Sequence, residues 1–225
     1  MKTRFSDSDD YINVWPSFTD MNFMIILVLF FIVILQHITE QDVFKMETIA
    51  GRKKEVWNAI RDAFPVQTDD SIQIITKNDE SPQMLTIHFS NKILFPLGKA
   101  DSDTIKEEGK RILQALAGVI VNFDGYFREI KVQGHTDNVP YTNVEEVYSN
   151  WDLSSDRATK VVKTIISGMP QEKRKEYEKL LVAAGYSEYK PRADNLFDEK
   201  GKPKGNEMNR RIDIEFEFEY ESTLE

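Results

Sequence analysis

Cysteine is absent from the 225 residues of this chain, and histidine occurs only three times. The lack of cysteine excludes disulfides, thiolate zinc sites, thiol catalysis and a lipid-modified N-terminal cysteine. The sequence also lacks a Gly-x-Ser-x-Gly motif, a Walker sequence and a His-Glu-x-x-His motif, and His37, His88 and His135 are scattered along it. We therefore predict no catalytic residues, no metal site, no cofactor and no enzymatic activity.

An excess of positive charge is also missing. The 38 acidic residues outnumber the 29 lysines and arginines, and the formal net charge is -9. Because phosphate backbones are bound through clusters of lysine and arginine, this balance argues against nucleic acid as a partner. The composition, 40% hydrophobic and 30% charged, is ordinary for a globular domain, and the length allows one membrane helix and one such domain.

A long apolar run near the N-terminus is the most prominent feature that is present. Residues 21–35 are apolar except for Asn22, and with their flanks they form a segment, 15–38, that is long enough to cross a bilayer as one helix. No small-x-small cleavage site follows the run, so we expect the helix to remain as an anchor. The preceding residues 1–14 form a short, polar and acidic tail.

A carboxylate, Asp20, lies about one turn inside this predicted membrane helix. A lone acidic residue in a membrane helix costs roughly 2.5–3.5 kcal/mol on insertion scales, so such residues usually serve a function. The default hypothesis is a site on a proton or cation pathway, at which Asp20 binds and releases the ion. Ser17, Thr19 and Asn22 are its polar neighbours and could contact the ion.

A linker over residues 39–70 follows the membrane helix and contains an amphipathic helix, predicted over 47–64. Its apolar residues recur at helical spacing, and Pro65 ends the pattern. We expect this helix to pack on the domain that follows. The alternative is a segment that contacts a membrane partner or blocks a channel.

Residues 71–221 are predicted to form one domain from strands of alternating polarity and amphipathic helices. The predicted strands are 71–76, 84–89, 127–133 and 211–220, and the predicted helices are 101–122, 154–169 and 171–184. In the last strand, one face is apolar and buried while the other carries acidic charge. The expected fold class is α+β, a small mixed β-sheet with helices packed on one face.

A cluster of polar residues lies where a predicted strand ends and a predicted helix begins. Residues 134–138 directly follow the strand, and a second polar block opens the helix, with Asp152 or Ser154 as its cap. In a pocket between the two blocks, Asp137 can bind an ammonium group and Arg157 a carboxylate, so a zwitterionic, amino-acid-like ligand fits. The alternative is a set of ordinary caps and surface ion pairs.

Four motifs resemble the successive signatures of OmpA-like peptidoglycan-binding domains. They are Phe95-Pro96-Leu97-Gly98-Lys99-Ala100, Gly134-His135-Thr136-Asp137-Asn138, Asn150-Trp151-Asp152-Leu153-Ser154-Ser155-Asp156-Arg157-Ala158 and Asn209-Arg210-Arg211-Ile212-Asp213-Ile214. The resemblance implies that Asp137 holds the ammonium of diaminopimelate in the stem peptide and that Arg157 holds its carboxylate. The pocket neighbours that it implies are Thr136, Asn138, Asn150 and Leu153. We interpret Asn209, Arg210 and Arg211 as mainly structural residues that tie the last strand to the fold.

The membrane helix carries a second resemblance. The segment Pro16-Ser17-Phe18-Thr19-Asp20-Met21-Asn22-Phe23 is similar to the start of the single membrane helix of MotB-type stator subunits. The resemblance implies an ion-driven rotary motor in the bacterial inner membrane, with a cytoplasmic N-terminus and a periplasmic C-terminal domain. The implied partners are a second copy of the chain, a pentamer of a multi-helix A subunit of the MotA or ZorA kind, and peptidoglycan.

Departures from flagellar MotB favour a particular subset of such chains, the B subunits of the Zorya anti-phage defence system. The chain is short, its N-terminal tail is acidic rather than basic, and Asn22 follows Asp20 by two residues. The alternatives are a flagellar stator subunit and a passive tether between membrane and peptidoglycan without ion conduction. Carboxylate, hydroxyl and amide groups suit both a proton and a sodium ion.

Overall fold

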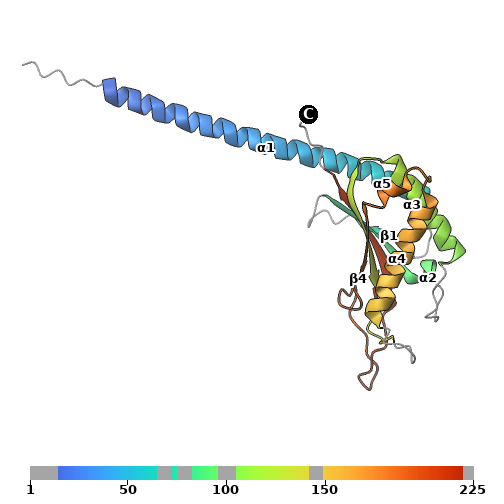
Figure 1. Cartoon of the computed structure of the whole chain (residues 1–225). Helices are drawn as coiled ribbons and strands as arrows, with labels where there is room; N and C mark the ends of the chain where they lie inside the picture. Colours follow the sequence, from blue (N-terminus) through green and yellow to red (C-terminus); the bar gives the residue numbers. More distant parts are fainter. Residues whose placement is uncertain (1–14, 65–71, 76–82, 96–104, 142–148, 220–225) are drawn as a thin grey trace, which may run out of the picture. The chain divides into compact units, whose positions relative to one another are not determined.

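A computed structural model of the chain describes residues 15–64, 72–75, 83–95, 105–141 and 149–219 (Figure 1). For residues 15–18, 45 and 72–75 it describes the backbone alone. The chain divides into two compact units, Met1–Lys45 and Met46–Glu225.

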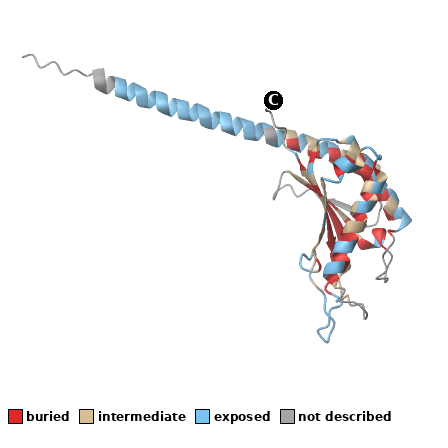
Figure 2. Ribbon diagram, viewed as in Figure 1, coloured by how far each residue is buried: buried red, intermediate tan, exposed pale blue. Residues whose placement is uncertain are grey.

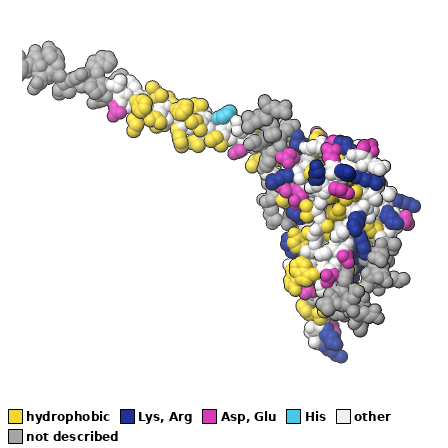
Figure 3. All heavy atoms as spheres, in the orientation of Figure 1, with side chains coloured by type: hydrophobic (Ala, Val, Ile, Leu, Met, Phe, Trp, Pro, Cys, Tyr) yellow, Lys and Arg dark blue, Asp and Glu magenta, His cyan; other side chains and the backbone are white. Residues whose placement is uncertain are grey.

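The first unit contains most of the long helix α1, which runs from Trp15 to Ala63. The side chains of its apolar run are exposed (Figures 2 and 3). By length and composition this helix can cross a membrane. The two helices predicted over 15–38 and 47–64 are one continuous helix, because no proline lies between Pro16 and Pro65 to interrupt it.

The last turns of α1 belong to the second unit and complete its hydrophobic core. Ile49, Val56 and Ile60 are buried there, and Trp57 and Phe64 pack against the same core. The predicted packing of the 47–64 helix on the domain is thereby confirmed. The helix ends at Ala63, two residues before Pro65, because proline cannot continue the hydrogen-bond ladder.

A mixed five-stranded sheet forms the centre of the second unit, in the order β1-β2-β5-β3-β4. Only β3 and β4 are parallel, whereas the other neighbouring pairs are antiparallel. The strands are β1 (Ile72–Ile75), β2 (Met84–Ser90), β3 (Phe127–His135), β4 (Leu181–Gly185) and β5 (Arg211–Phe218). The helical segments are α2 (Asn91–Leu94), α3 (Glu107–Asn122), α4 (Asn150–Gly168), α5 (Arg174–Tyr177) and the 3-10 turn η1 (Glu207–Asn209).

Helices α3 and α4 cover one face of this sheet, as predicted (Figure 1). The apolar residues of β2, β3 and β5 alternate along each strand and point toward these helices. Figure 2 shows the buried residues gathered between the sheet and the helices. The α+β fold class expected from the alternation of strands and helices is therefore confirmed.

Three helix predictions differ from the structure. Helix α3 begins at Glu107, and residues 101–104 lie outside the described part of the chain. Helix α4 begins at Asn150, because the carboxylate of Asp152 accepts hydrogen bonds from the backbone N–H and the hydroxyl of Ser149, at 2.8 Å each, and fixes the N-terminus there. Ser154, one of the two predicted caps, lies inside the helix.

The helix predicted over 171–184 is mostly wrong. Only α5 is helical in this range, and residues 181–184 belong to β4. The segment pairs in parallel with β3, so that Val182 lies opposite Lys131 and Ala184 opposite Gln133. The hydrogen bonds of the sheet therefore outweigh the helix propensity of its two alanines.

The second face of the sheet carries a buried polar cluster that joins β2, β3 and β5. Asp213 Oδ1 lies 2.5 Å from His88 Nδ1, and its Oδ2 lies 2.9 Å from Arg211 Nε and 3.3 Å from His135 Nε2. The strand register explains the cluster, because it pairs His88 with Asp213 and His135 with Arg211. His88 and His135 are thus not scattered in space, and the acidic face predicted for β5 is buried at Asp213.

The protonation of this cluster follows from its burial and its charges. Burial raises the pKa of the Asp213 carboxyl, but the contacts with the two histidines and the charge of Arg211 outweigh it and lower that pKa well below its usual range. Burial lowers the pKa of His135, and the neighbouring Asp213 offsets this only in part. At neutral pH the cluster therefore contains a carboxylate, a guanidinium and a neutral His135.

Candidate ligand-binding site at the end of strand β3

The candidate site lies where β3 ends and α4 begins, and two glycines allow these elements to approach closely. A Cβ atom at Gly134 would overlap the carbonyl oxygen of Ser154, and one at Gly185 would overlap the hydroxyl of Ser155. The N-terminal turn of α4 is therefore packed directly on the ends of β3 and β4. Beyond the strands, the pairing continues with a hydrogen bond of 2.9 Å from Thr136 N to the carbonyl oxygen of Ser187.

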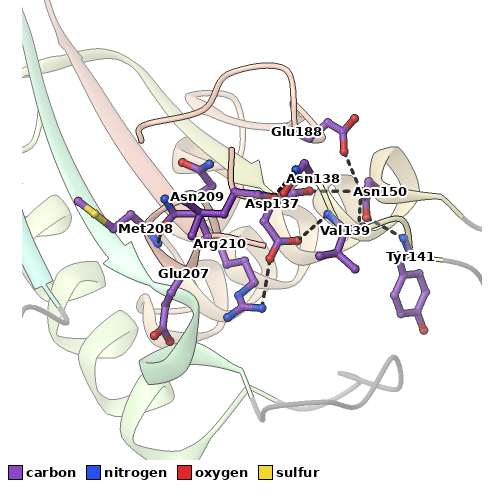
Figure 4. A network of polar contacts seen from close by, with 12 residues as sticks. Asp137, Asn138, Val139, Tyr141, Asn150, Glu188, Glu207, Met208, Asn209 and Arg210 are labelled. Atoms are coloured by element: carbon purple, nitrogen blue, oxygen red, sulfur yellow. Dashed lines mark hydrogen bonds and ion pairs between the residues drawn. The ribbon is translucent and has the colours of Figure 1, made fainter. Parts of the chain in front are cut away.

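Asp137 is the buried carboxylate of the site. Its Oδ1 accepts a hydrogen bond of 3.3 Å from the backbone N–H of Val139, and its Oδ2 lies 3.2 Å from Arg210 Nη1 (Figure 4). The backbone of Gly205 also lies against Oδ2, since a Cβ atom at that position would crowd it. Gly205 has φ +80, a conformation that favours glycine, so the close approach depends on this residue.

Asn150 fixes the loop around Asp137. Its Nδ2 donates to the carbonyl oxygens of Val139 at 3.1 Å and Asp137 at 3.4 Å, and to the carboxylate oxygen Oε2 of Glu188 at 3.4 Å (Figure 4). Its Oδ1 accepts from the N–H of Tyr141 at 3.2 Å. These contacts join the N-terminus of α4 to the loop after β3 and the loop after β4. The side chain of Asn150 therefore positions the site by its hydrogen bonds to the backbone of these loops.

Asn138 and Thr136 complete the loop after β3 and are also buried. Asn138 Nδ2 donates to the carbonyl oxygen of Leu196 at 3.2 Å, which ties the 190s loop to the site. The hydroxyl of Thr136 and the amide oxygen of Asn138 have no hydrogen-bond partner among the residues that the structure describes. Buried polar atoms are seldom left unpaired in native proteins, so these two atoms are candidates for contact with a bound polar group or a water molecule.

Arg157 and Leu153 lie on the same buried face of α4 as Asn150, at the helical spacing of three, four and seven residues. The guanidinium carbon of Arg157 lies 5.3 Å from the ring centroid of Phe95, at the end of α2. All six site residues predicted from the sequence are thus buried at the β3–α4 junction. Hydrogen bonds join Asp137, Asn138 and Asn150 to the surrounding loops.

Arg210, predicted from its motif to be mainly structural, contacts Asp137 of the site. Asn209 does have a structural position, because its Oδ1 accepts from the N–H groups of Arg192 and Ala193 at 2.8 and 2.9 Å. Arg211 turns to Asp213 on the far face of the sheet. The three neighbouring residues of this motif therefore contact three different parts of the domain, and only the structure shows that Arg210 faces Asp137.

Exposed apolar side chains occur on the segments that build the site. Beyond α1, the large apolar residues that the structure shows as exposed all lie on the segments that build it: Val139, Trp151, Tyr189, Leu196, Phe197 and Met208. The rings of Trp151 and Tyr189 stack with their centroids 5.4 Å apart. These exposed residues are called the rim, and exposed apolar residues on segments that also hold a buried carboxylate are typical of a binding surface. Within the described ranges, no group of three or more histidine, cysteine, aspartate and glutamate residues is arranged to hold a metal ion.

At the other end of the chain, the predicted ion-binding residue lies on α1. Asp20, Thr19 and Asn22 are all exposed on this helix, and the side chain of Ser17 lies outside the described residues. They share the helix with the apolar run that follows them. The role of Asp20 in carrying an ion stays a prediction.

Comparisons with known proteins give a family match, which lies within the second unit, and several sequence relatives. The OmpA family matches residues 99–203. Motility protein B of Bacillus subtilis is 34% identical over 142 residues, which are 63% of this chain and 48% of that protein. Motility protein B of Escherichia coli K12 is 38% identical over 79 residues, 35% of this chain and 24% of that protein. The chain thus spans about half, or less, of the length of these curated relatives.

A solved structure supports the same fold. A protein described as MotB-like from Desulfovibrio vulgaris aligns with a TM-score of 0.58 at 20% identity, over 77% of this chain and 99% of that one. At this identity the likeness concerns the fold alone. The family match lies within the second unit, and the sequence relatives and this likeness of fold agree with it in similarity to OmpA-family and MotB proteins.

Proposed function

We propose that the chain is the B subunit of an ion-driven motor in the bacterial inner membrane, anchored to peptidoglycan by its second unit. The observation that carries this proposal is the combination of two features in one chain. Helix α1 is long and apolar enough to cross a membrane and carries Asp20 near its start. The second unit is an OmpA-like domain with a buried carboxylate at the end of β3.

The anchoring half of the proposal uses Asp137 and Arg157. A stem peptide with diaminopimelate presents an ammonium and a carboxylate on one carbon, and a buried Asp and a buried Arg offer the opposite charges. Asn150 and Asn138 hold the surrounding backbone by the hydrogen bonds described above. The exposed rim, including Trp151 and Tyr189, would contact the neighbouring wall material.

The motor half of the proposal uses Asp20. Two copies of the chain would place their α1 helices inside a ring of multi-helix A subunits, five by family resemblance. Protonation or ion binding at Asp20 would remove its charge, and each change of charge would let the ring step. Peptidoglycan supplies the fixed point, so the second unit lies in the periplasm and the N-terminus in the cytoplasm.

The motor half is tested by Asp20→Asn, with Asp42→Asn as the matched control. Both residues are exposed carboxylates on α1, but only Asp20 adjoins the apolar run. We expect Asp20→Asn to abolish motor-dependent function, whereas Asp42→Asn keeps it, and both should still bind peptidoglycan. Full activity of Asp20→Asn would leave a passive tether as the better description.

The anchoring half is tested by co-sedimentation of the detergent-solubilised chain with purified diaminopimelate-type peptidoglycan. We expect the double variant Asp137→Ala, Arg157→Ala to lose binding. A control that removes the same charges elsewhere, Glu178→Ala with Arg128→Ala, should bind like the wild type, because both residues are exposed and lie outside the segments that build the site. Unchanged binding by the first double variant would refute the assignment of the pocket.

Two biological settings fit the same motor. We favour a Zorya-type anti-phage defence system, because residues 1–14 are acidic and Asn22 follows Asp20 by two residues. Two of the sequence relatives are named motility protein B, which favours a flagellar stator as the second candidate. Phage-protection and swimming assays of a strain that lacks the chain, with and without complementation, separate the two settings.

A further inference from the structure

The buried carboxylate of the candidate site already has a cationic partner. The side chain of Asp137 is 6% exposed, and Arg210 Nη1 lies 3.2 Å from its Oδ2. The proposed ligand would bring an ammonium group to the same carboxylate. The guanidinium of Arg210 therefore occupies the position at Asp137 that the ammonium of the ligand would take.

The surroundings of Asp137 leave little other room for an ammonium. Its Oδ1 accepts from the N–H of Val139, and the backbone of Gly205 lies against Oδ2. A Cβ atom at Gly205 would meet Oδ2, so no side chain separates the two segments. Among the described groups, the guanidinium of Arg210 is the cation that contacts this carboxylate.

Arg210 is fixed at its backbone and free to turn at its side chain. Its N–H donates to the carbonyl oxygen of Glu207 at 3.1 Å, and its carbonyl oxygen accepts from the N–H of Asn91 at 3.0 Å. Its side chain is 39% exposed, so the guanidinium can turn into water without repacking the core. The nearby carboxylate of Glu207 is paired with Lys92 at 2.7 Å rather than with Arg210.

We propose that Arg210 is a built-in competitor of the ligand, a counter-cation that the ammonium group must displace from Asp137. The proposal rests on the proposed function, because it takes Asp137 as the group that binds ammonium. In the closed state Arg210 is paired with Asp137, and in the open state the carboxylate is available to the ligand. The apparent affinity for the ligand is the affinity of the open state multiplied by the fraction of molecules that are open. A simple amine, with one contact to offer, binds too weakly to occupy the site. A zwitterion also binds Arg157 through its carboxylate, and this second contact lets its ammonium displace Arg210 from Asp137.

The size of the effect follows from the kind of ion pair. Partly exposed pairs contribute roughly 0.2–1 kcal/mol, which corresponds to a change in affinity of roughly 1.4-fold to fivefold. Because Asp137 is buried, we expect the upper end of this range. Removal of the guanidinium by Arg210→Gln should therefore tighten ligand binding by about fivefold, whereas Arg210→Lys, which keeps the cation, should change it little.

The test is isothermal titration calorimetry of the detergent-solubilised full chain with a soluble muropeptide that contains meso-diaminopimelate. The matched control is Arg128→Gln. Arg128 also forms an ion pair of 3.2 Å, with Glu217, so this substitution removes the same charge at a position away from the site. Asp137→Asn tests the ligand site itself. Circular dichroism of each variant checks that the fold is kept.

Each outcome decides between the alternatives. Tighter binding by Arg210→Gln, with Arg128→Gln and Arg210→Lys near wild type, supports the competitor. Weaker binding by Arg210→Gln would show that Arg210 contacts the ligand, and equal binding would show that it is a bystander. Either result overturns the competitor but leaves the proposed function standing if Asp137→Asn loses binding. Absence of binding by the wild type and by Arg210→Gln overturns both proposals.

Discussion

Substitution of Asp213 by asparagine probes the polar cluster on the second face of the sheet. Three nitrogen atoms surround this carboxylate, from Arg211, His88 and His135. Asp213, Arg211 and His135 are buried, and the side chain of His88 is 12% exposed. An asparagine side chain has a single oxygen and an NH2 group, so it cannot accept from all three. The change also leaves the guanidinium of Arg211, which is 8% exposed, without a counter-charge.

The expected loss of stability is large. Removal of one partner of a buried ion pair costs roughly 3–5 kcal/mol, because the other charge stays buried and uncompensated. In a domain of this size, 1 kcal/mol corresponds to a shift in the melting temperature of about 2–4 °C, so the domain should melt roughly 6–20 °C lower. Replacement of both partners by apolar residues, Asp213→Leu with Arg211→Met, should recover much of the loss, since no buried charge then remains.

The assay is urea unfolding of the detergent-solubilised chain, followed by tryptophan fluorescence, since Trp57 packs against the domain core. Glu199→Gln is the matched control, because it removes the same charge from an exposed loop residue. We expect the control to lie within about 0.5 kcal/mol of the wild type. A loss below about 1 kcal/mol for Asp213→Asn would show that the cluster is hydrated or rearranges easily, and would refute this reasoning.

Two further predictions concern the same strands. Burial lowers the pKa of His135 below its ordinary value near 6.5, so below pH 6.5 the folded state binds fewer protons than the unfolded state. The contribution of His135 to stability is therefore full above pH 6.5 and falls as the pH drops below it. We expect the urea midpoint to decrease between pH 7.5 and 5.5, and to depend less on pH in His135→Gln. In the same unfolding experiment, Gly134→Ala should destabilise the domain by about 1–3 kcal/mol, because the added Cβ would overlap the carbonyl oxygen of Ser154. Its control is Gly118→Ala in the middle of α3, where nothing lies near the added Cβ, and this change should stabilise the domain by about 0.5–1 kcal/mol.

The features that could be predicted from the sequence are those that follow from local periodicity. Ile212, Ile214 and Phe216 alternate with charged residues, and they are buried in β5 as expected. An apolar strand pattern directly precedes Asp137 and predicts its position after the end of the strand, where it is buried. A pattern of period two identifies both the strand and its buried face.

The features that could not be predicted depend on contacts between distant segments. Strand β4, Leu181–Gly185, has no alternation of its own and becomes a strand through its pairing with β3. His88 and Asp213 are 125 positions apart and meet because the register of β2 and β5 places them side by side. The contact between Arg210 and Asp137 likewise depends on where the long loop after β4 returns to the sheet. No local pattern in the sequence carries such information.

The position of β5 has a consequence for the order in which the domain can be built. This strand follows the others in the sequence but lies in the middle of the sheet, between β2 and β3. As the ribosome makes the chain, β2 and β3 emerge first, and each keeps an unpaired edge until residues 211–218 arrive. The sheet therefore closes only after synthesis of Phe218, and chains released before that point would expose two strand edges to aggregation and to chaperones.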